Sequence, residues 1–181
     1  CSKTSRLERV NTGSVAQRLA DTPGVARTIL GAARAARGMP GADPRAMSHS
    51  WLFTGPPGSG RSLAAIDFAA ALMCTDPEEP GCGRCEACRA VLETKQHTDL
   101  VLVDPQEVII PVDTVREVIG RAASLPTVAP WRVVIFNNAD RLNNNGANAL
   151  LKTVEEPPAR TVIIMCAVSY THLTLPTKRI V

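Results

Sequence analysis

Short apolar runs alternate with longer amphipathic segments through most of the chain. The runs are apolar at nearly every position rather than at every second one, as in strands whose two faces are both covered. The segments between them place apolar residues three or four positions apart, which predicts helices. Strands separated by helices favour an α/β fold, with a parallel sheet and helices on both of its faces. The expected strands are Trp51–Thr54, Asp99–Val103, Arg132–Phe136 and Thr161–Ala167, and the expected helices are Leu19–Arg37, Leu63–Met73, Thr114–Ala123 and Asn148–Glu155.

Turn residues mark the ends of several of these elements. The Gly/Pro-rich stretch Gly38–Pro44 ends the first helix and predicts a linker. Asp113 directly precedes the third helix and is predicted to be its N-cap. Pro157 and Pro158 stop the last helix before the fourth strand.

Composition narrows the class of protein. Apolar types make up 45% and charged types 20% of the 181 residues, the mix of a folded globular domain rather than of a disordered or fibrous chain. Aromatic residues make up 3%, so a stacking platform for single-stranded nucleic acid is not expected. The net charge of +3 does not by itself indicate an anionic partner.

Two features indicate a cytoplasmic location with no membrane partner. The longest apolar runs, Phe68–Cys74 and Val162–Val168, have seven residues each and are too short to cross a bilayer. The first thirty residues contain no apolar stretch of the kind that directs secretion. In a reducing compartment, the six cysteines favour metal ligands or thiols over disulfides.

The two ends differ from the rest of the chain. Residues 1–13 are polar and show no usable period, and residues 1–17 are predicted to be a poorly defined N-terminal arm, natural or artefactual. Residues 168–177 resemble the translation of a transposon-end sequencing adapter. Residues 168–181 are therefore expected to be a non-native tail, and the domain is expected to occupy residues 18–167.

A glycine-rich loop follows the first expected strand. Residues 55–62 have the phosphate-loop spacing G-x-x-x-x-G-K-[S/T], except that Arg61 replaces the lysine. Glycines allow backbone N–H groups to converge on a phosphate, and a serine at the last position can hold Mg²⁺. A planar guanidinium does not replace a compact ammonium between phosphates, so ATP binding stays open, and a plain strand–helix turn is the alternative. The candidate nucleotide-binding residues are Gly55, Gly58, Ser59, Gly60, Arg61 and Ser62.

Four cysteines follow the helix after this loop. Their spacing is C-x7-C-x2-C-x2-C, and four thiolates complete a closed tetrahedral Zn²⁺ site of the structural type. Gly81 and Gly83 permit the tight turn, and Arg84 and Arg89 are expected to offset the negative charge. An iron–sulfur cluster, buried inert thiols, and a redox pair formed by the last two cysteines are the alternatives. The candidate zinc ligands are Cys74, Cys82, Cys85 and Cys88, within a module at residues 74–88.

The third expected strand ends in neutral amides. In phosphate-loop enzymes, the strand expected beside the loop ends in carboxylates that hold Mg²⁺ and activate water. Here Asn137 and Asn138 occupy those positions, and Asp140 lies two or three residues beyond these amides. An amide neither neutralises the metal nor takes a proton, so ATP hydrolysis by this chain is not expected.

An ordered set of motifs resembles the bacterial clamp-loader subunits of DNA polymerase III. The set comprises His49–Phe53, the cysteine module, His97–Val101 and Asn148–Pro158, and the resemblance extends from about Arg18 to Ala167. It implies part of an AAA+ (RecA-like, P-loop) domain whose lid and C-terminal collar domains are absent. The altered loop and the amide strand end are similar to the non-motor delta-prime members, and Arg61-Ser62 is similar to high-GC Gram-positive forms.

The resemblance also implies a function and partners. Such subunits form a hetero-oligomeric ring with gamma/tau and delta subunits, and the ring loads the sliding clamp onto primed DNA in replication. The chain would then be a subunit of a DNA-directed DNA polymerase (nucleotidyltransferase) holoenzyme, with no polymerase site of its own. The family's trans-acting arginine is expected beyond Ala167 and is assigned to no residue here. A gamma/tau-like ATPase motor, with Asp140 as the carboxylate, is the alternative.

Overall fold

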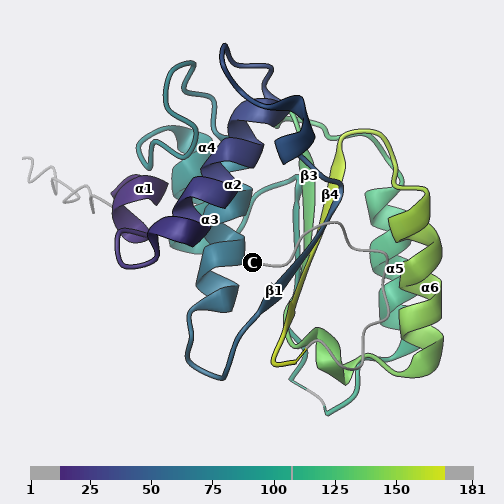
Figure 1. Cartoon of the computed structure of the whole chain (residues 1–181). Helices are drawn as coiled ribbons and strands as arrows, with labels where there is room; N and C mark the ends of the chain where they lie inside the picture. The colour runs from purple at the N-terminus through teal and green to yellow at the C-terminus, as the bar shows by residue number, and fades with distance from the viewer. Residues whose placement is uncertain (1–12, 107, 170–181) are drawn as a thin grey trace, which may run out of the picture.

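Four parallel strands form the centre of the fold, in the order β1-β4-β3-β2 (Figure 1). The computed structural model describes residues 13–106 and 108–169. All four predicted strands are confirmed, with starts shifted by one residue in the first two. The strands are β1 (Ser50–Thr54), β2 (Leu100–Val103), β3 (Arg132–Phe136) and β4 (Thr161–Ala167).

The strand β4 lies in the middle of the sheet and is buried along its whole length. It pairs with β1, where Thr54 is opposite Ala167, and with β3, where Phe136 is opposite Met165. The prediction that β3 runs beside the strand of the glycine loop is therefore wrong, because β4 separates the two. The carboxyl ends of β1, β4 and β3 still meet at one edge, since the strands are parallel.

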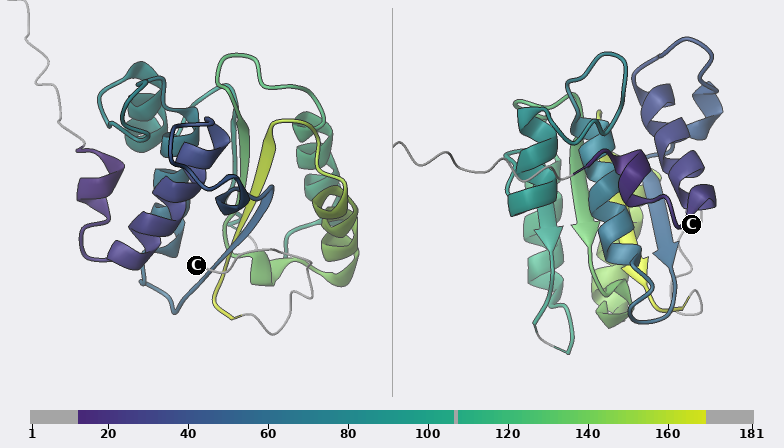
Figure 2. Two further views of the ribbon diagram at one scale, coloured as in Figure 1. Left: turned by 45° about the horizontal axis from the view of Figure 1, so that its top comes forward. Right: turned by 90° about the vertical axis from the view of Figure 1, so that its left-hand side faces the viewer.

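Helices cover both faces of the sheet, as the sequence predicts (Figures 1 and 2). One face packs α1, α2, α3 and the short α4 against a core that contains Trp51 and Phe68. The other face packs α5 and α6 against a core that contains Phe136 and Leu150. The helices are α1 (Val15–Arg18), α2 (Pro23–Ala36), α3 (Arg61–Met73), α4 (Glu86–Arg89), α5 (Val112–Ala122) and α6 (Asn144–Glu155), with short turns η1 (Pro44–Ala46), η2 (Ala90–Thr94) and η3 (Ala139–Arg141). Within the described ranges, no helix combines the length and apolar character needed to span a membrane.

Two helix starts differ from their predictions for reasons of capping. The residue at the N-cap of α5 is Pro111, and Asp113 lies inside the first turn, so the prediction of Asp113 as the N-cap is wrong. A carboxylate in the first turn still interacts favourably with the positive end of the helix dipole. The helix α6 begins four residues earlier than predicted, because the Asn143 side chain caps it by accepting the N–H of Gly146 at 2.7 Å.

The N-terminal residues of the described chain pack onto the domain. The predicted arm includes residues 13–17, but Ser14 caps α1 through a capping box and Val15 is fully buried. The remaining part of the predicted arm, residues 1–12, lies outside the described residues, as does the predicted tail after Ser169.

A buried carboxylate anchors the loop that leads into β3. Asp99 accepts the backbone N–H groups of residues 127, 128 and 129 at 2.7–2.8 Å and the Arg132 guanidinium at 3.1 Å. Burial acts to raise the pKa of Asp99, but the three N–H donors and Arg132 outweigh it and lower the pKa to about 2. The sequence pattern counted Asp99 as a strand residue, whereas it precedes β2 and holds a loop in place.

This carboxylate predicts a pH dependence of stability. The folded pKa lies below the ordinary value of 3.8, so the stabilisation is present above about pH 4 and is lost as the pH falls through about 2. The expected loss is about 2 kcal/mol of the free energy of unfolding. Urea denaturation at several pH values between about 5 and about 2 measures this loss of unfolding free energy. The Asp99→Asn variant is the control and should lack this component, and an identical pH profile for both proteins would contradict the assignment.

Candidate functional site

The glycine loop connects β1 to α3 at the carboxyl edge of the sheet. Gly58 and Gly60 both have left-handed backbone, with φ of 81° and 84°, and Gly60 is the N-cap of α3. A side chain is strained there, so these two glycines are required by the turn. Gly55 has little space for a side chain, since a Cβ on it would lie 2.5 Å from the Ser59 Oγ, which would have to rotate away. The N–H of Gly55 bonds to the carbonyl of Ala167, which ties the loop to the end of β4.

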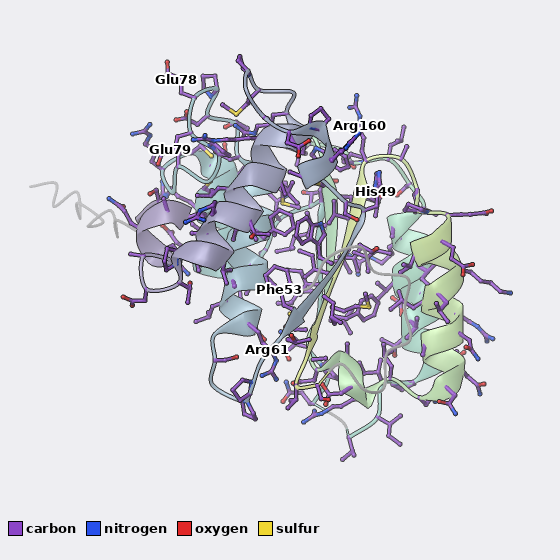
Figure 3. All side chains as sticks on the ribbon, viewed as in Figure 1. His49, Phe53, Arg61, Glu78, Glu79 and Arg160 are labelled. Carbon is purple, nitrogen blue, oxygen red and sulfur yellow. The ribbon has the colours of Figure 1, made fainter. Side chains whose placement is uncertain are left out.

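The Arg61 side chain folds back onto this loop. Its Nη1 donates to the carbonyl oxygens of Gly55 and Pro56, both at 2.9 Å. Its Nε is buried and has no hydrogen-bond partner in the part of the chain that the structure describes. Figure 3 shows Arg61 at the tip of the helical layer, below Phe53. The guanidinium therefore uses one of its nitrogens to hydrogen-bond two carbonyls of its own loop.

The thiol beneath the loop is a packing group. Cys166 is fully buried on β4, and burial raises its pKa to about 12, although the charge of Arg61 and the Ser62 side chain act to lower it. A thiol with this pKa stays protonated at neutral pH, so it is a poor nucleophile.

A cavity of about 460 Å³ adjoins the loop on the side of α1 and α2. Ser59, Gly60 and Arg61 form one wall, and apolar side chains such as Phe53 form the floor. Arg18 and Asp67 also line this cavity, and they form an ion pair in which the Arg18 Nε lies 2.6 Å from the Asp67 Oδ1. Sequence reasoning missed this pair, although Asp67 is the single charged residue inside the otherwise apolar helix segment Leu63–Met73.

The end of β3 carries the two predicted amides. Asn137 is buried and its N–H donates to the carbonyl of Val103 at 2.8 Å. Its Oδ1 has no hydrogen-bond partner among the described residues. Asp140 is exposed on η3, and its Oδ1 accepts the N–H of Val168 at 3.3 Å. Asp140, the first carboxylate after the two amides, thus makes a hydrogen bond to the backbone just after β4.

The four cysteines lie together at the other end of α3. Their sulfur atoms all lie within 4.8 Å of one another, with Sγ–Sγ distances of 3.6 Å for Cys74–Cys82 and 3.8 Å for Cys74–Cys85. A tetrahedron with metal–sulfur bonds of ~2.3 Å has edges of about 3.8 Å, so these residues fit a Zn²⁺ ion. All four are free cysteines, and Cys88 completes the set.

Backbone N–H groups point at the sulfur atoms of this cluster. The N–H groups of Asp76, Cys85 and Cys88 each lie 3.4 Å from the Sγ of a cysteine two or three residues earlier. The hydrogen bond from Cys88 and those from the backbone lower the pKa of Cys74 to about 4, against the effect of burial, whereas the same hydrogen bond and burial raise the pKa of Cys88. Such donors stabilise thiolates, which is the form that binds a metal.

The two arginines of the module have carboxylate partners. Arg84 lies 3.0 Å from Asp76, and Arg89 lies 3.5 Å from Glu93. The hydrogen bond to Asp76 and the charge of Cys82 both act to raise the pKa of Arg84. The expectation that Arg84 and Arg89 offset the negative charge of the sulfurs stays a prediction.

The two sites are separate. The loop lies at the N-terminus of α3 and Cys74 is the C-cap of the same helix, whose 13 residues span about 20 Å. Figure 3 shows this separation, with Arg61 at one end of the helical layer and Glu79 of the cysteine module at the other.

Comparison with known proteins assigns the family. The family model described as "DNA polymerase III, delta subunit" matches residues 42–179. The chain belongs to the clamp-loader subunits of DNA polymerase III. This confirms the resemblance seen in the sequence, and the sheet order with its glycine loop fits the expected AAA+ P-loop fold.

Several curated relatives of this clamp-loader family are similar to the chain. It is 37% identical over 133 residues to DNA polymerase III subunit delta' of Pseudomonas aeruginosa, covering 72% of this chain and 40% of that protein. It is 35% identical over 139 residues to subunit gamma/tau of Mycobacterium tuberculosis H37Rv, covering 76% and 24%. Subunit delta' of Bacillus subtilis is 29% identical over 119 residues, covering 66% and 36%. The chain thus spans 40% or less of the length of these clamp-loader relatives.

A solved structure shares the fold. The gamma subunit-related protein of Thermotoga maritima superposes with a TM-score of 0.50 at 22% identity, covering 74% of this chain and 41% of that chain. At this identity the likeness bears on the fold alone.

Proposed function

We propose that this chain is a clamp-loader subunit of the non-motor, delta-prime type, which helps to load the sliding clamp onto primed DNA without hydrolysing ATP. The observation that carries the proposal is the Arg61 guanidinium, which donates to two carbonyls of its own loop. In a nucleotide motor, the corresponding ammonium reaches the β- and γ-phosphates. A guanidinium already held by the loop does not take that role.

The strand end supports the same proposal. Catalysis of phosphoryl transfer needs carboxylates for Mg²⁺ and for positioning the water. The chain has Asn137 and Asn138 at the end of β3, and the nearest carboxylate that follows, Asp140, lies exposed on η3. The residues 55, 58, 59, 60, 61 and 62 would form at most a phosphate-binding turn with no hydrolytic step.

The partners follow from the family. We propose that the chain assembles with gamma/tau and delta subunits in a hetero-oligomeric ring, and that the ring contacts the sliding clamp and primed DNA. The similarity of the chain to delta' proteins supports this assembly, since those relatives are named as subunits of DNA polymerase III. The chain would act as a rigid member of that ring beside the neighbouring ATP site.

A structural zinc ion is part of this proposal. The sulfur spacing and the N–H donors fit Zn²⁺ with four thiolate ligands and no open coordination position. When bound, the ion would cross-link the segment after α3, and it would take no part in phosphate chemistry.

One observation favours the alternative of a gamma/tau-like motor. The gamma/tau subunit of Mycobacterium tuberculosis is 35% identical to the chain, close to the 37% of the Pseudomonas aeruginosa delta' subunit. Identity alone therefore separates the two types poorly, and the Arg61 geometry is the better criterion.

Replacing Arg61 by alanine distinguishes the two functions. In a clamp loader reconstituted with the natural subunit, we expect the Arg61→Ala variant to change the rate of clamp loading by less than about twofold, because the side chain donates its hydrogen bonds to carbonyls of its own loop. A fluorescence assay of clamp loading onto primed DNA measures the rate.

The matched control is the alanine variant of the phosphate-loop lysine in the gamma/tau subunit of the same complex, which should abolish loading. Abolition of loading by Arg61→Ala, with the ring still assembled, would instead identify this chain as a motor.

A further inference from the structure

The cysteine module is in backbone contact with the N-terminal helix α1. The N–H of Val15 donates to the carbonyl of Gly81 at 2.8 Å. A Cβ on Gly81 would lie 2.6 Å from the Val15 Cγ2, and a Cβ on Gly83 would lie 1.9 Å from the carbonyl oxygen of Gly13. Residues 13–15 therefore lie so close to the module that only glycines fit on either side of Cys82.

The shape of this contact surface depends on the cysteines. Gly81 and Gly83 have φ of 77° and 72°, a left-handed backbone that glycine adopts readily but that needs surrounding contacts to persist. The residue between them, Cys82, lies 3.6 Å from Cys74 and takes the N–H of Cys85 on its sulfur. A metal ion bound to these sulfurs would fix the loop in this shape.

The opposite end of α1 carries an arginine, Arg18, that forms an ion pair with Asp67 of α3. The Arg18 Nε lies 2.6 Å from the Oδ1 of Asp67, whose side chain is 2% exposed while that of Arg18 is 27% exposed. Burial raises the pKa of Asp67, and the hydrogen bond and charge of Arg18 counteract this effect. If α1 moved away, Asp67 would lose the ion-pair partner that the structure records for it, and a buried unpaired carboxylate is costly.

The same residues form the wall of the cavity beside the glycine loop. Arg18, Leu19 and Asp67 line it together with Ser59 and Arg61. The helix α1 thus connects the cysteine module, at one end of α3, with the cavity at the other end.

We propose that the metal-bound cysteine module positions α1, and that α1 in turn pairs Arg18 with Asp67 and lines the cavity next to the loop. The module is then a positioning device for the phosphate-loop side of the domain. This inference rests on the metal binding proposed above, and the experiment separates the two.

Hydrogen exchange in the full natural protein tests the coupling. The amides of Arg18 and Leu19 donate within α1 to the carbonyls of Ser14 and Val15. We expect removal of the metal with a chelator to accelerate their exchange by about tenfold or more, because the contact of residues 13–15 with the cysteine module would be lost. The amides of α5, on the far face of the sheet, should change by less than about twofold.

A variant outside the ligand set gives a second measurement. Val15→Ser weakens the packing of α1 against the module and leaves all four cysteines in place. We therefore expect an unchanged metal content, and hydrogen exchange of the α1 amides about tenfold faster with the metal bound. Ala16→Ser is the matched control, because Ala16 is exposed on the same helix and its replacement should alter neither quantity.

Each result decides the inference. Accelerated exchange confined to α1 supports it. A protein that binds metal but keeps α1 protected after chelation overturns the coupling alone. Equal loss of protection in α1 and α5 also overturns it, since the metal would then support the whole fold. A protein that binds no metal overturns both this inference and the proposed zinc site.

Discussion

The Asp99→Ala variant is expected to lose about 3–5 kcal/mol of the free energy of unfolding. Asp99 is completely buried, and its carboxylate accepts three backbone N–H groups and the Arg132 guanidinium. Alanine would leave these donors without their shared acceptor, and each unsatisfied buried donor costs about 1–3 kcal/mol. Equilibrium denaturation of the natural protein in urea measures the loss.

The exposed carboxylate of Asp113 provides the control. Its side chain is 90% exposed and lies 3.6 Å from Arg116, so Asp113→Ala should change the free energy of unfolding by less than about 0.5 kcal/mol. Equal unfolding midpoints for the two alanine variants would show that the Asp99 contacts contribute little.

The Cys82→Ser variant is expected to bind zinc more than about 100-fold more weakly than the parent protein. Cys82 lies at the centre of the module, with its sulfur 3.6 Å from that of Cys74. A serine hydroxyl replaces a thiolate poorly at Zn²⁺, and losing a direct ligand exceeds the effect of losing an outer hydrogen bond. Competition with a chromophoric chelator measures the affinity, and elemental analysis measures the metal content.

Cys166→Ser is the matched control, since it makes the same replacement on β4, outside the cluster. It should retain one zinc ion per chain. A coloured protein that contains iron would favour the cluster alternative. Reversible loss of the Cys85 and Cys88 thiols under mild oxidation, with no metal bound, would favour the redox alternative.

The regular elements of the fold could be predicted because their signals are local. The apolar runs of β3 and β4 have the bounds that the sequence predicts, and the two cores lie on opposite faces of the sheet. Strand neighbours carry no such local signal. The prediction placed β3 beside the strand of the glycine loop, but the pairing of β4 with both β1 and β3 arises from the order in which the crossovers return to the sheet.

The candidate sites could be predicted as residue sets and only partly as geometry. The cysteine spacing alone brought four sulfurs together, because short ligand spacings leave few arrangements. The glycine spacing identified the loop, but the position of the Arg61 side chain depends on which carbonyls lie within its reach. The Asp99 and Asp67 contacts join residues 28 to 49 positions apart, so no sequence window contains both partners.

The burial of Cys166 has a practical consequence for chemical labelling. Its pKa of about 12 and its position beneath the loop make it slow to react with iodoacetamide or maleimide in the folded protein. Alkylation of the folded, metal-free domain should therefore discriminate among the described cysteines, because Cys85 is partly exposed and, against the effect of burial, its hydrogen bonds lower the pKa of its thiol. Mass spectrometry of alkylated residues 74–88 would then report how many molecules in a preparation carry the ion.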